Sequence, residues 1–360
     1  MNSGTDALSW FAHACVFTVV LYRQSMEFIS KWIDCKKDRI NQIRISPQIG
    51  ISGKSLLSLI WVTHLQEELQ VKKEMKMSLD NPSKSARLLM RSSVDESLRL
   101  QNEVFCNQLL RDIKSHPLFR NPAIDALKFG AFDKATLRDV HLDFRHGVVQ
   151  IFTDAIVMAQ FHTRQLEHRL GAKGKMASRF LLGLNLLDEF GFCPGYGEDN
   201  TERYRGNPLL SHPLLFDAML EEFNVDDLVR DYFLKSEAAK ELRSSIEVAF
   251  GDLWSLLVLL VAGEEVVLVY TPAMRRAARM VGVNVEHGYY MAHGSSEDSE
   301  VTAFDDDHQR DALEILICTI EPHQYTKVRA VAMDYCTLWD CFWRQQMLRL
   351  EYTPMSRQAS

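Results

Sequence analysis

The chain has 360 residues, of which 46% are hydrophobic and 25% are charged, and its formal net charge is −7. Such a chain is long and apolar enough to bury a core, which argues against general disorder. Acidic and basic residues are interspersed, and no basic stripe carries interleaved aromatic residues, so we expect no nucleic-acid partner.

Seven cysteines are scattered along the chain without any C-x-x-C pair: Cys15, Cys35, Cys106, Cys193, Cys318, Cys336 and Cys341. An odd number with this spacing fits reduced thiols better than a disulfide framework or a zinc ribbon. The sequence therefore predicts a cytoplasmic protein in which the cysteines are small core residues.

Residues 1–93 differ in composition from the rest and are expected to form an N-terminal extension of unclear role. The apolar run Ala7–Tyr22 is shorter than the roughly 20 residues of a membrane span, so it predicts a packed helix. The sequence GISGKS at 50–55 has two residues between its first glycine and its Gly-Lys pair, where a phosphate-binding loop needs four. The segment 77–95 is expected to be either a linker or a native start at Met77.

From Val94 onward, apolar residues recur with the period of a helix, and runs that alternate like strands are nearly absent. One long helical segment covers 134–170, and Gly and Pro cluster between such segments, most densely at 191–213. The fold class predicted for residues 94–360 is therefore all-α, a bundle of about eight helices.

The apolar run Trp254–Tyr270 carries Glu264 and Glu265 at its centre. An acidic residue costs roughly 2.5 to 3.5 kcal/mol in lipid, so the run predicts a buried helix and not a membrane span. A buried carboxylate needs a cation or a metal ion, so we expect at least one of the two to face inward toward such a partner. The alternative is that Gly263 ends the helix and both glutamates reach water.

The segment 289–311 contains two histidines and seven acidic residues. Asp305 and His308 form a D-x-x-H pair, whose spacing places both side chains on one face of a helix, as a shared metal ion requires. The alternative is a solvated helix start, where acidic residues are favoured. Asp143 and His146 have the same spacing, so the spacing alone is not specific. No E-x-x-H occurs, which disfavours a ferritin-type di-iron bundle.

Other histidines and tyrosines are candidates for supporting roles. We expect His287, Tyr289 and Tyr290 either beside the acidic cluster or in the core. We expect ordinary hydrogen-bonded helix histidines at His141, His162, His168 and His323.

Several segments, in chain order over residues 110–325, resemble the heme-oxygenase-like di-iron oxidases and oxygenases. That superfamily also includes TenA-type thiaminases and pyrroloquinoline-quinone synthase. The segments are HPLFRNPAIDALKFGAFDKATLRDV, NLLDEFGF, SHPLLF, YYMAH and DDDHQRDALEIL. The resemblance implies that residues 94–360 form a heme-oxygenase-like helical bundle.

In that family a Glu and a His, a second Glu from a later helix, and a final His, Asp and His bind two irons. Carried onto this sequence, the resemblance implies the ligands Glu189, His212, Glu264 or Glu265, His293, Asp305 and His308. Carboxylates and imidazoles in this number suit iron or manganese better than zinc. Considered without the rest of the set, Glu189 would be interpreted as a surface residue at a helix C-terminus, and His212 as a capping residue.

Two spacings differ from the family pattern. A loop of 22 residues separates Glu189 from His212, and eleven residues separate His293 from Asp305 where the family has three. On one unbroken helix His293 and His308 would lie about 22 Å apart, too far for one dinuclear centre, so the helix must break between them. The sequence HGSSEDSEVT favours such a break. If the break does not bring the two together, Glu297 is the alternative ligand.

The resemblance implies an O2-dependent non-heme iron oxidoreductase with two bound Fe ions. Its substrate would be a small organic molecule, such as an amino acid, an amine or a fatty acid, in specialised metabolism. We expect no membrane partner, and a homodimer is a compatible assembly. Two alternatives stay open: a metal-free TenA-like enzyme, and a non-enzymatic helical interaction protein whose acidic loop 294–307 is solvated.

Overall fold

A computed structural model of the chain describes residues 81–194, 204–292 and 305–351. The chain divides into two compact units, Met1–Met75 and Lys76–Ser360, and every described residue belongs to the second unit. The predictions for the run Ala7–Tyr22 and for the sequence GISGKS therefore lie outside the described residues.

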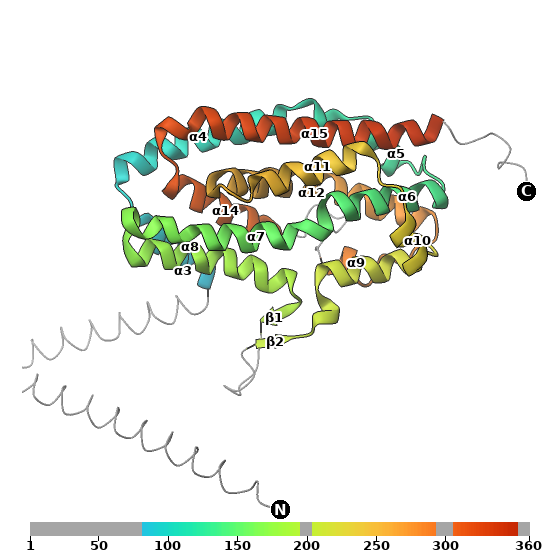
Figure 1. The fold of residues 1–360 in the computed structure, drawn as a ribbon, viewed down its shortest axis with the longest axis horizontal. Helices are drawn as coiled ribbons and strands as arrows, with labels where there is room; N and C mark the ends of the chain where they lie inside the picture. The colour runs from blue at the N-terminus through green and yellow to red at the C-terminus, as the bar shows by residue number, and fades with distance from the viewer. Residues whose placement is uncertain (1–80, 195–203, 293–304, 352–360) are drawn as a thin grey trace, which may run out of the picture. The chain divides into compact units, whose positions relative to one another are not determined.

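The described residues form an all-α fold, as predicted, with one short pair of strands (Figure 1). The helices are α3 (Pro82–Arg91), α4 (Glu96–Ser115), α5 (Ala123–Lys128), α6 (Lys134–Phe144), α7 (Gln150–His162), α8 (Glu167–Glu189), α9 (His212–Glu221), α10 (Asp227–Tyr232), α11 (Glu237–Ala249), α12 (Leu253–Met280), α13 (Tyr289–Ala292), α14 (Asp305–Thr319) and α15 (Tyr325–Glu351). The strands are β1 (Phe192–Pro194) and β2 (Tyr204–Gly206).

The segment predicted as one long helix, 134–170, is helical throughout but changes its hydrogen-bonding pattern twice. A π-helical turn, η2 (Arg145–Val149), joins α6 to α7, and a 3-10 turn (Thr163–Leu166) joins α7 to α8. Asp133 caps the start of α6, where its carboxylate accepts a hydrogen bond from the Thr136 backbone N–H at 2.7 Å. Such π-helical turns are rare and occur frequently at functional sites.

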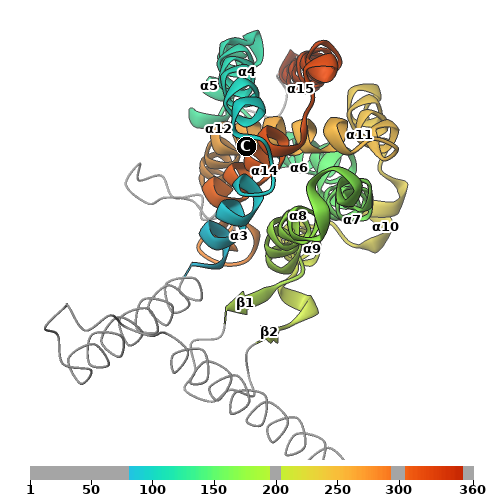
Figure 2. The same ribbon diagram turned by 90° about the vertical axis from the view of Figure 1, so that its left-hand side faces the viewer.

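Helix α12 is the central helix of the bundle and packs against α14, α15, α5 and α7 (Figures 1 and 2). Asp252 caps its start and accepts a hydrogen bond from the Ser255 backbone N–H at 2.9 Å. By length and composition alone α12 could cross a membrane, but 78% of its most apolar window is buried inside the bundle. Its apolar character is therefore used to build the core.

Helix α15 supplies much of the rest of the core. Trp343 stacks on Tyr270 of α12 with 4.3 Å between the ring centroids. The Tyr270 hydroxyl donates a hydrogen bond to the Leu118 carbonyl at 2.7 Å, which satisfies its polar end. Three cysteines are buried as predicted, whereas a fourth is exposed on α15; they are Cys106, Cys318 and Cys336, and Cys341.

Helix α3 lies in the range 1–93, predicted to be an N-terminal extension of unclear role, and it packs against α8 and α14. Arg91 and Glu314 of α14 make a bidentate ion pair, with Nε–Oε1 and Nη2–Oε2 distances of 2.7 and 2.6 Å. Arg87 of α3 contacts Asp311 of α14 at 2.6 Å. These partners lie 223 and 224 residues further along the chain, so local composition gave no indication of them.

Candidate functional site

Glu189 and His212 lie side by side in the interior of the bundle. Glu189 is the last residue of α8 and His212 is the first residue of α9. The His212 Nδ1 atom lies 3.1 Å from Glu189 Oε1, and both residues are buried. The two residues that the family resemblance placed first in the ligand set therefore meet in space, despite the 22-residue loop between them.

The strand pair explains how this loop returns to its starting point. Strands β1 and β2 are antiparallel, with Phe192 opposite Gly206, and the Asn207 backbone N–H donates to the Gly191 carbonyl at 3.2 Å. Gly191 has a φ of 78°, and a Cβ there would lie 2.7 Å from the Ser211 backbone nitrogen. Only glycine permits this close approach. In Figures 1 and 2, β1 continues from α8 and β2 leads back to α9.

Asp188 lies between two imidazoles. Its Oδ2 atom is 3.9 Å from His212 Nε2 and 3.7 Å from His308 Nε2. His308 is in the first turn of α14, which packs against α8. Both distances exceed a direct hydrogen bond. Asp188 was not among the predicted site residues, although it directly precedes Glu189 in the segment NLLDEFGF.

Glu264 reaches the same place from α12. A cavity of about 40 Å³ is lined by Val149, Phe152, Glu189, His212, Glu264, Val267 and Tyr289. A single water needs roughly 10 to 15 Å³ on this measure, so the cavity admits a few water-sized groups and no organic substrate. Its polar lining comes from α8, α9, α12 and α13, four elements that are separated along the chain.

Glu265, the neighbour of Glu264, has different surroundings. Its Oε1 atom lies 2.8 Å from Lys114 Nζ of α4. This contact is an ion pair between a buried carboxylate and a largely exposed ammonium group. Helix α12 continues to Met280 and both glutamates are buried, so the alternative in which Gly263 ends the helix is wrong.

The rest of the predicted ligand set is outside the description. His293 and Glu297 are not among the described residues, and Asp305 is described only as the first residue of α14, without its side chain. Of the predicted final His, Asp and His, the structure therefore places the side chain of His308 alone.

Tyr289 and Tyr290 of α13 have different environments, one at the cavity and one in the core. Tyr289 lines the cavity, and its ring lies edge-on to His212 with 6.5 Å between centroids. Tyr290 contacts His141, with 2.6 Å between its hydroxyl and Nε2. His141 Nδ1 lies 2.7 Å from the Leu137 carbonyl, and burial lowers the pKa of His141 to about 4. A neutral His141 therefore donates to Leu137 and accepts from Tyr290, which anchors α13.

The chemistry of these side chains suits a cation. The carboxylates of Glu189 and Glu264 lie with the His212 imidazole at one cavity, and the partly exposed Asp188 carboxylate lies near both His212 and His308. Ionised carboxylates in the interior are costly unless a cation or hydrogen bonds compensate them. Two ligand atoms that share a divalent ion at bond lengths of about 2.1 Å lie at most about 4.2 Å apart. The 3.1 Å between His212 Nδ1 and Glu189 Oε1 is within that limit.

Within the described ranges, no three His, Cys, Asp or Glu side chains form a cluster already arranged to hold a metal ion. The carboxylate–imidazole contacts among these residues are those of His212 with Glu189 and Asp188, and of His308 with Asp188. Comparison of the sequence with protein-family models gives no match, and comparison with curated proteins gives none either. The functional assignment therefore depends on the chemistry of the site.

Proposed function

We propose that this protein is a non-heme di-iron oxidase or oxygenase built on a heme-oxygenase-like bundle. One observation carries the proposal: side chains from α8, α9 and α12, namely Glu189, His212 and Glu264, line one small buried cavity. His308 of α14 extends this group, since it shares the carboxylate of Asp188 with His212.

The donor atoms support iron in particular. Carboxylate oxygens and imidazole nitrogens suit Fe(II) or Mn(II), whereas a structural zinc site uses four ligands, mostly thiolate and imidazole. In this proposal Glu189, His212, Glu264 and His308 hold the metal, together with His293 and with Asp305 or Glu297. Two bound Fe(II) ions would supply the electrons for reaction with O2 and thereby the oxidation of an organic substrate.

The protein's own groups have defined roles in this proposal. Val149, Phe152 and Tyr289 line the cavity and exclude bulk water from it. Asp188, whose side chain is 38% exposed, faces both imidazoles and connects them to solvent. The cavity is too small for an organic substrate, so an amino acid, amine or fatty acid would bind outside it.

Anaerobic loading with Fe(II), followed by gel filtration and metal analysis, tests the proposal. We expect about two irons per chain in the native protein and a clear loss in His308→Ala and in Glu189→Gln. His323→Ala is the matched control, because His323 is 72% exposed and pairs with Glu321 at the surface. Native protein without iron, or His308→Ala with as much iron as the native chain, would contradict the proposal.

A second candidate is a metal-free, TenA-like enzyme. The 3.1 Å contact between His212 Nδ1 and Glu189 Oε1 favours it, because a buried imidazole–carboxylate pair can accept and return a proton without a metal. An activity that persists in a strong chelator, with no iron retained after loading, would support this candidate over the first.

A further inference from the structure

A second, larger cavity lies beside the π turn η2 and has a different chemical character. Its volume is about 510 Å³, within the range of small-molecule sites. Four cations and one acid line it, together with a histidine, an amide and two apolar side chains. The lining residues are Leu142, Arg145, His146, Gln150, Arg230, Asp231, Phe233, Lys235 and Lys240. We call this cavity the basic pocket.

The segment 231–235 forms one wall of the basic pocket. Asp231, Phe233 and Lys235 line the pocket, whereas the intervening Tyr232 and Leu234 are exposed. Asp231 and Tyr232 end α10, and the backbone is extended from Phe233 onward, where successive side chains point to opposite sides. The wall therefore presents one apolar ring and one ammonium group to the same space.

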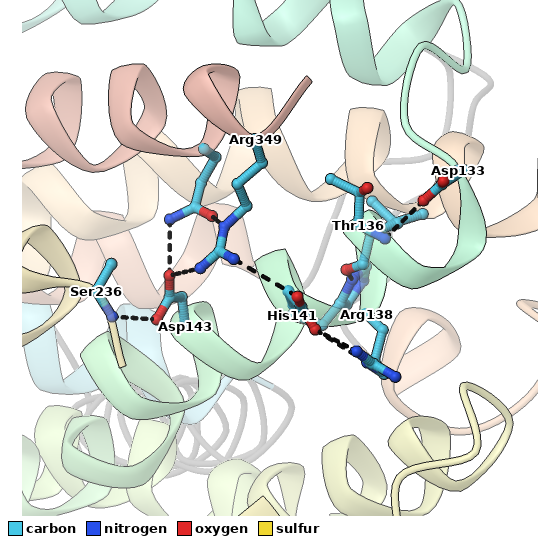
Figure 3. A network of polar contacts seen from close by, with 10 residues as sticks. Asp133, Thr136, Arg138, His141, Asp143, Ser236 and Arg349 are labelled. Carbon is cyan, nitrogen blue, oxygen red and sulfur yellow. Dashed lines mark hydrogen bonds and ion pairs between the residues drawn. The ribbon is translucent and has the colours of Figure 1, made fainter. Parts of the chain in front are cut away.

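A buried carboxylate fixes the end of this wall. Asp143 Oδ1 accepts a hydrogen bond from the Ser236 backbone N–H at 2.8 Å, and Oδ2 accepts one from Arg349 Nη2 at 2.7 Å (Figure 3). The Arg349 guanidinium also lies over the Phe233 ring, 5.9 Å from its centroid. Lys235 thus stands between two anchored residues, which reduces the entropy lost when the wall meets a ligand.

Three of the four lining cations have acidic partners: Arg145 and Arg230 pair with Asp217, Arg230 also pairs with Asp227, and Lys240 pairs with Glu237. Arg145 and Arg230 share the carboxylate of Asp217, at 2.8 and 3.5 Å. Lys240 pairs with Glu237, which is 81% exposed, so solvent weakens that pair. Lys235 makes no ion pair with any residue that the structure describes.

The pKa of His146, which also lines the pocket, is affected by the same positive charges. The pKa of His146 is lowered, first by burial and then by the positive charges of Arg243 and Lys235, whereas Asp143 and a hydrogen bond to Gln150 oppose this. Arg243 donates to the His146 carbonyl at 3.3 Å. A cavity with this field attracts an anion.

We propose that the basic pocket binds a small organic anion. Its carboxylate or phosphate would contact Lys235 and the guanidinium groups of Arg145 and Arg230, and its apolar body would lie against Leu142 and Phe233. This site is separate from the cavity of Glu189 and differs from it in chemistry. The two are close in the chain, because η2 contributes Arg145 and His146 to the basic pocket and Val149 to the other cavity. The inference does not depend on iron.

Isothermal titration calorimetry on the full chain at low ionic strength tests the proposal with four probes. Phenylacetate and phenyl phosphate carry the two anionic groups on one apolar ring, benzyl alcohol lacks the charge, and inorganic phosphate lacks the ring. We expect at least one aromatic anion to bind more tightly than benzyl alcohol and inorganic phosphate, and its affinity to fall as salt is added. Comparison of the two anions identifies the preferred headgroup.

The same titration is repeated with the variant Lys235→Gln. This variant should bind the preferred anion about tenfold more weakly, which corresponds to the loss of one charge-assisted hydrogen bond. Lys173→Gln, an exposed lysine of α8 that does not line the pocket, should leave the affinity unchanged. Thermal unfolding of both variants establishes that they are folded, and Lys240→Gln replaces Lys235→Gln if that variant is not. No binding of either anion, equal binding of benzyl alcohol, equal binding of inorganic phosphate, or an unchanged affinity in the folded pocket variant would each overturn the proposal.

Discussion

Glu264 and Glu265 are adjacent in the sequence but face different sides of α12. Glu264 lines the cavity with Glu189 and His212, whereas the carboxylate of Glu265 lies 2.8 Å from Lys114 Nζ. Successive residues of a helix are about 100° apart around its axis. One residue therefore contributes to the candidate site and the next to an ion pair at the rim of the bundle.

This difference predicts opposite behaviour of two isosteric variants. Glu264→Gln should lose most of the Fe(II) that the native chain retains after anaerobic loading, because a neutral amide is a poor ligand for a divalent ion. Glu265→Gln should retain its iron and lose only its attraction to Lys114, at a cost of about 1 kcal/mol in unfolding free energy. Metal analysis and urea unfolding measure the two effects. Equal iron loss in both variants would mean that the cavity does not distinguish the two carboxylates.

Gly191→Ala should destabilise the protein more than a glycine replacement with the same backbone strain elsewhere. A Cβ at residue 191 would meet the Leu210 and Ser211 backbones at 2.6 and 2.7 Å, so the strand pair would have to move. We expect a loss of about 2 to 3 kcal/mol in urea unfolding.

Gly282→Ala is the matched control, because its φ of 80° is nearly the same and no atom lies within 4 Å of the added Cβ. It should cost about 1 kcal/mol. Similar losses in the two variants would show that the closure of β1 on β2 does not depend on this contact.

Arg91→Ala should weaken the attachment of α3 to α14. The change leaves the buried carboxylate of Glu314 without its bidentate partner, and we expect a cost of about 2 kcal/mol in unfolding free energy. Arg99→Ala breaks a pair with Glu103 on the surface of α4 and should cost no more than about 0.5 kcal/mol. Urea unfolding compares the two, and a smaller loss for Arg91→Ala than for Arg99→Ala would contradict this account of α3.

The buried His141 should make stability depend on pH. Its pKa is lowered from 6.5 to about 4 in the folded protein, so between these values the unfolded chain binds the extra proton. The stabilisation is fully present above pH 6.5 and is lost as the pH falls toward 4, by roughly 3 kcal/mol in total. Urea unfolding at intervals from pH 7 to pH 4 measures this loss.

The contribution of His141 is isolated by difference, since carboxylates also titrate over part of this range. His141→Gln cannot take up the proton, so its stability should decline less over the same interval than that of the native chain. The exposed His323 provides the comparison, and His323→Gln should follow the native curve. Parallel curves for the native chain and His141→Gln would exclude His141 as the source.

Local pattern was sufficient for several features of this protein. The helical period of the apolar residues predicted the all-α fold, because a helix must place its apolar residues on one side to bury them. Two glutamates in an apolar run predicted buried carboxylates with partners, since an uncompensated charge is too costly inside a protein. Cys106, Cys318 and Cys336 were correctly expected in the core.

Other features could not be read from local pattern. The strand pair β1 and β2 is three residues long on each side and sits in a Gly- and Pro-rich segment, so no alternating run revealed it. Asp188 became a candidate site residue only because α14 places His308 Nε2 3.7 Å from its carboxylate. The basic pocket combines residues of α6, η2, α7, α10 and α11 with the segment after α10, and its cations have no common spacing in the sequence.

The sequence alone determined that the chain forms helices, that α12 is buried, and that its two glutamates need partners. These three features depend only on residue type and on the recurrence of apolar residues every 3.6 positions. The tertiary structure decided which glutamate meets Glu189 and His212, and that a 22-residue excursion closes on itself. It also decided that α3 is held by α14. These outcomes depend on contacts between residues far apart in the chain, whose free energies arise only when packing brings the groups together.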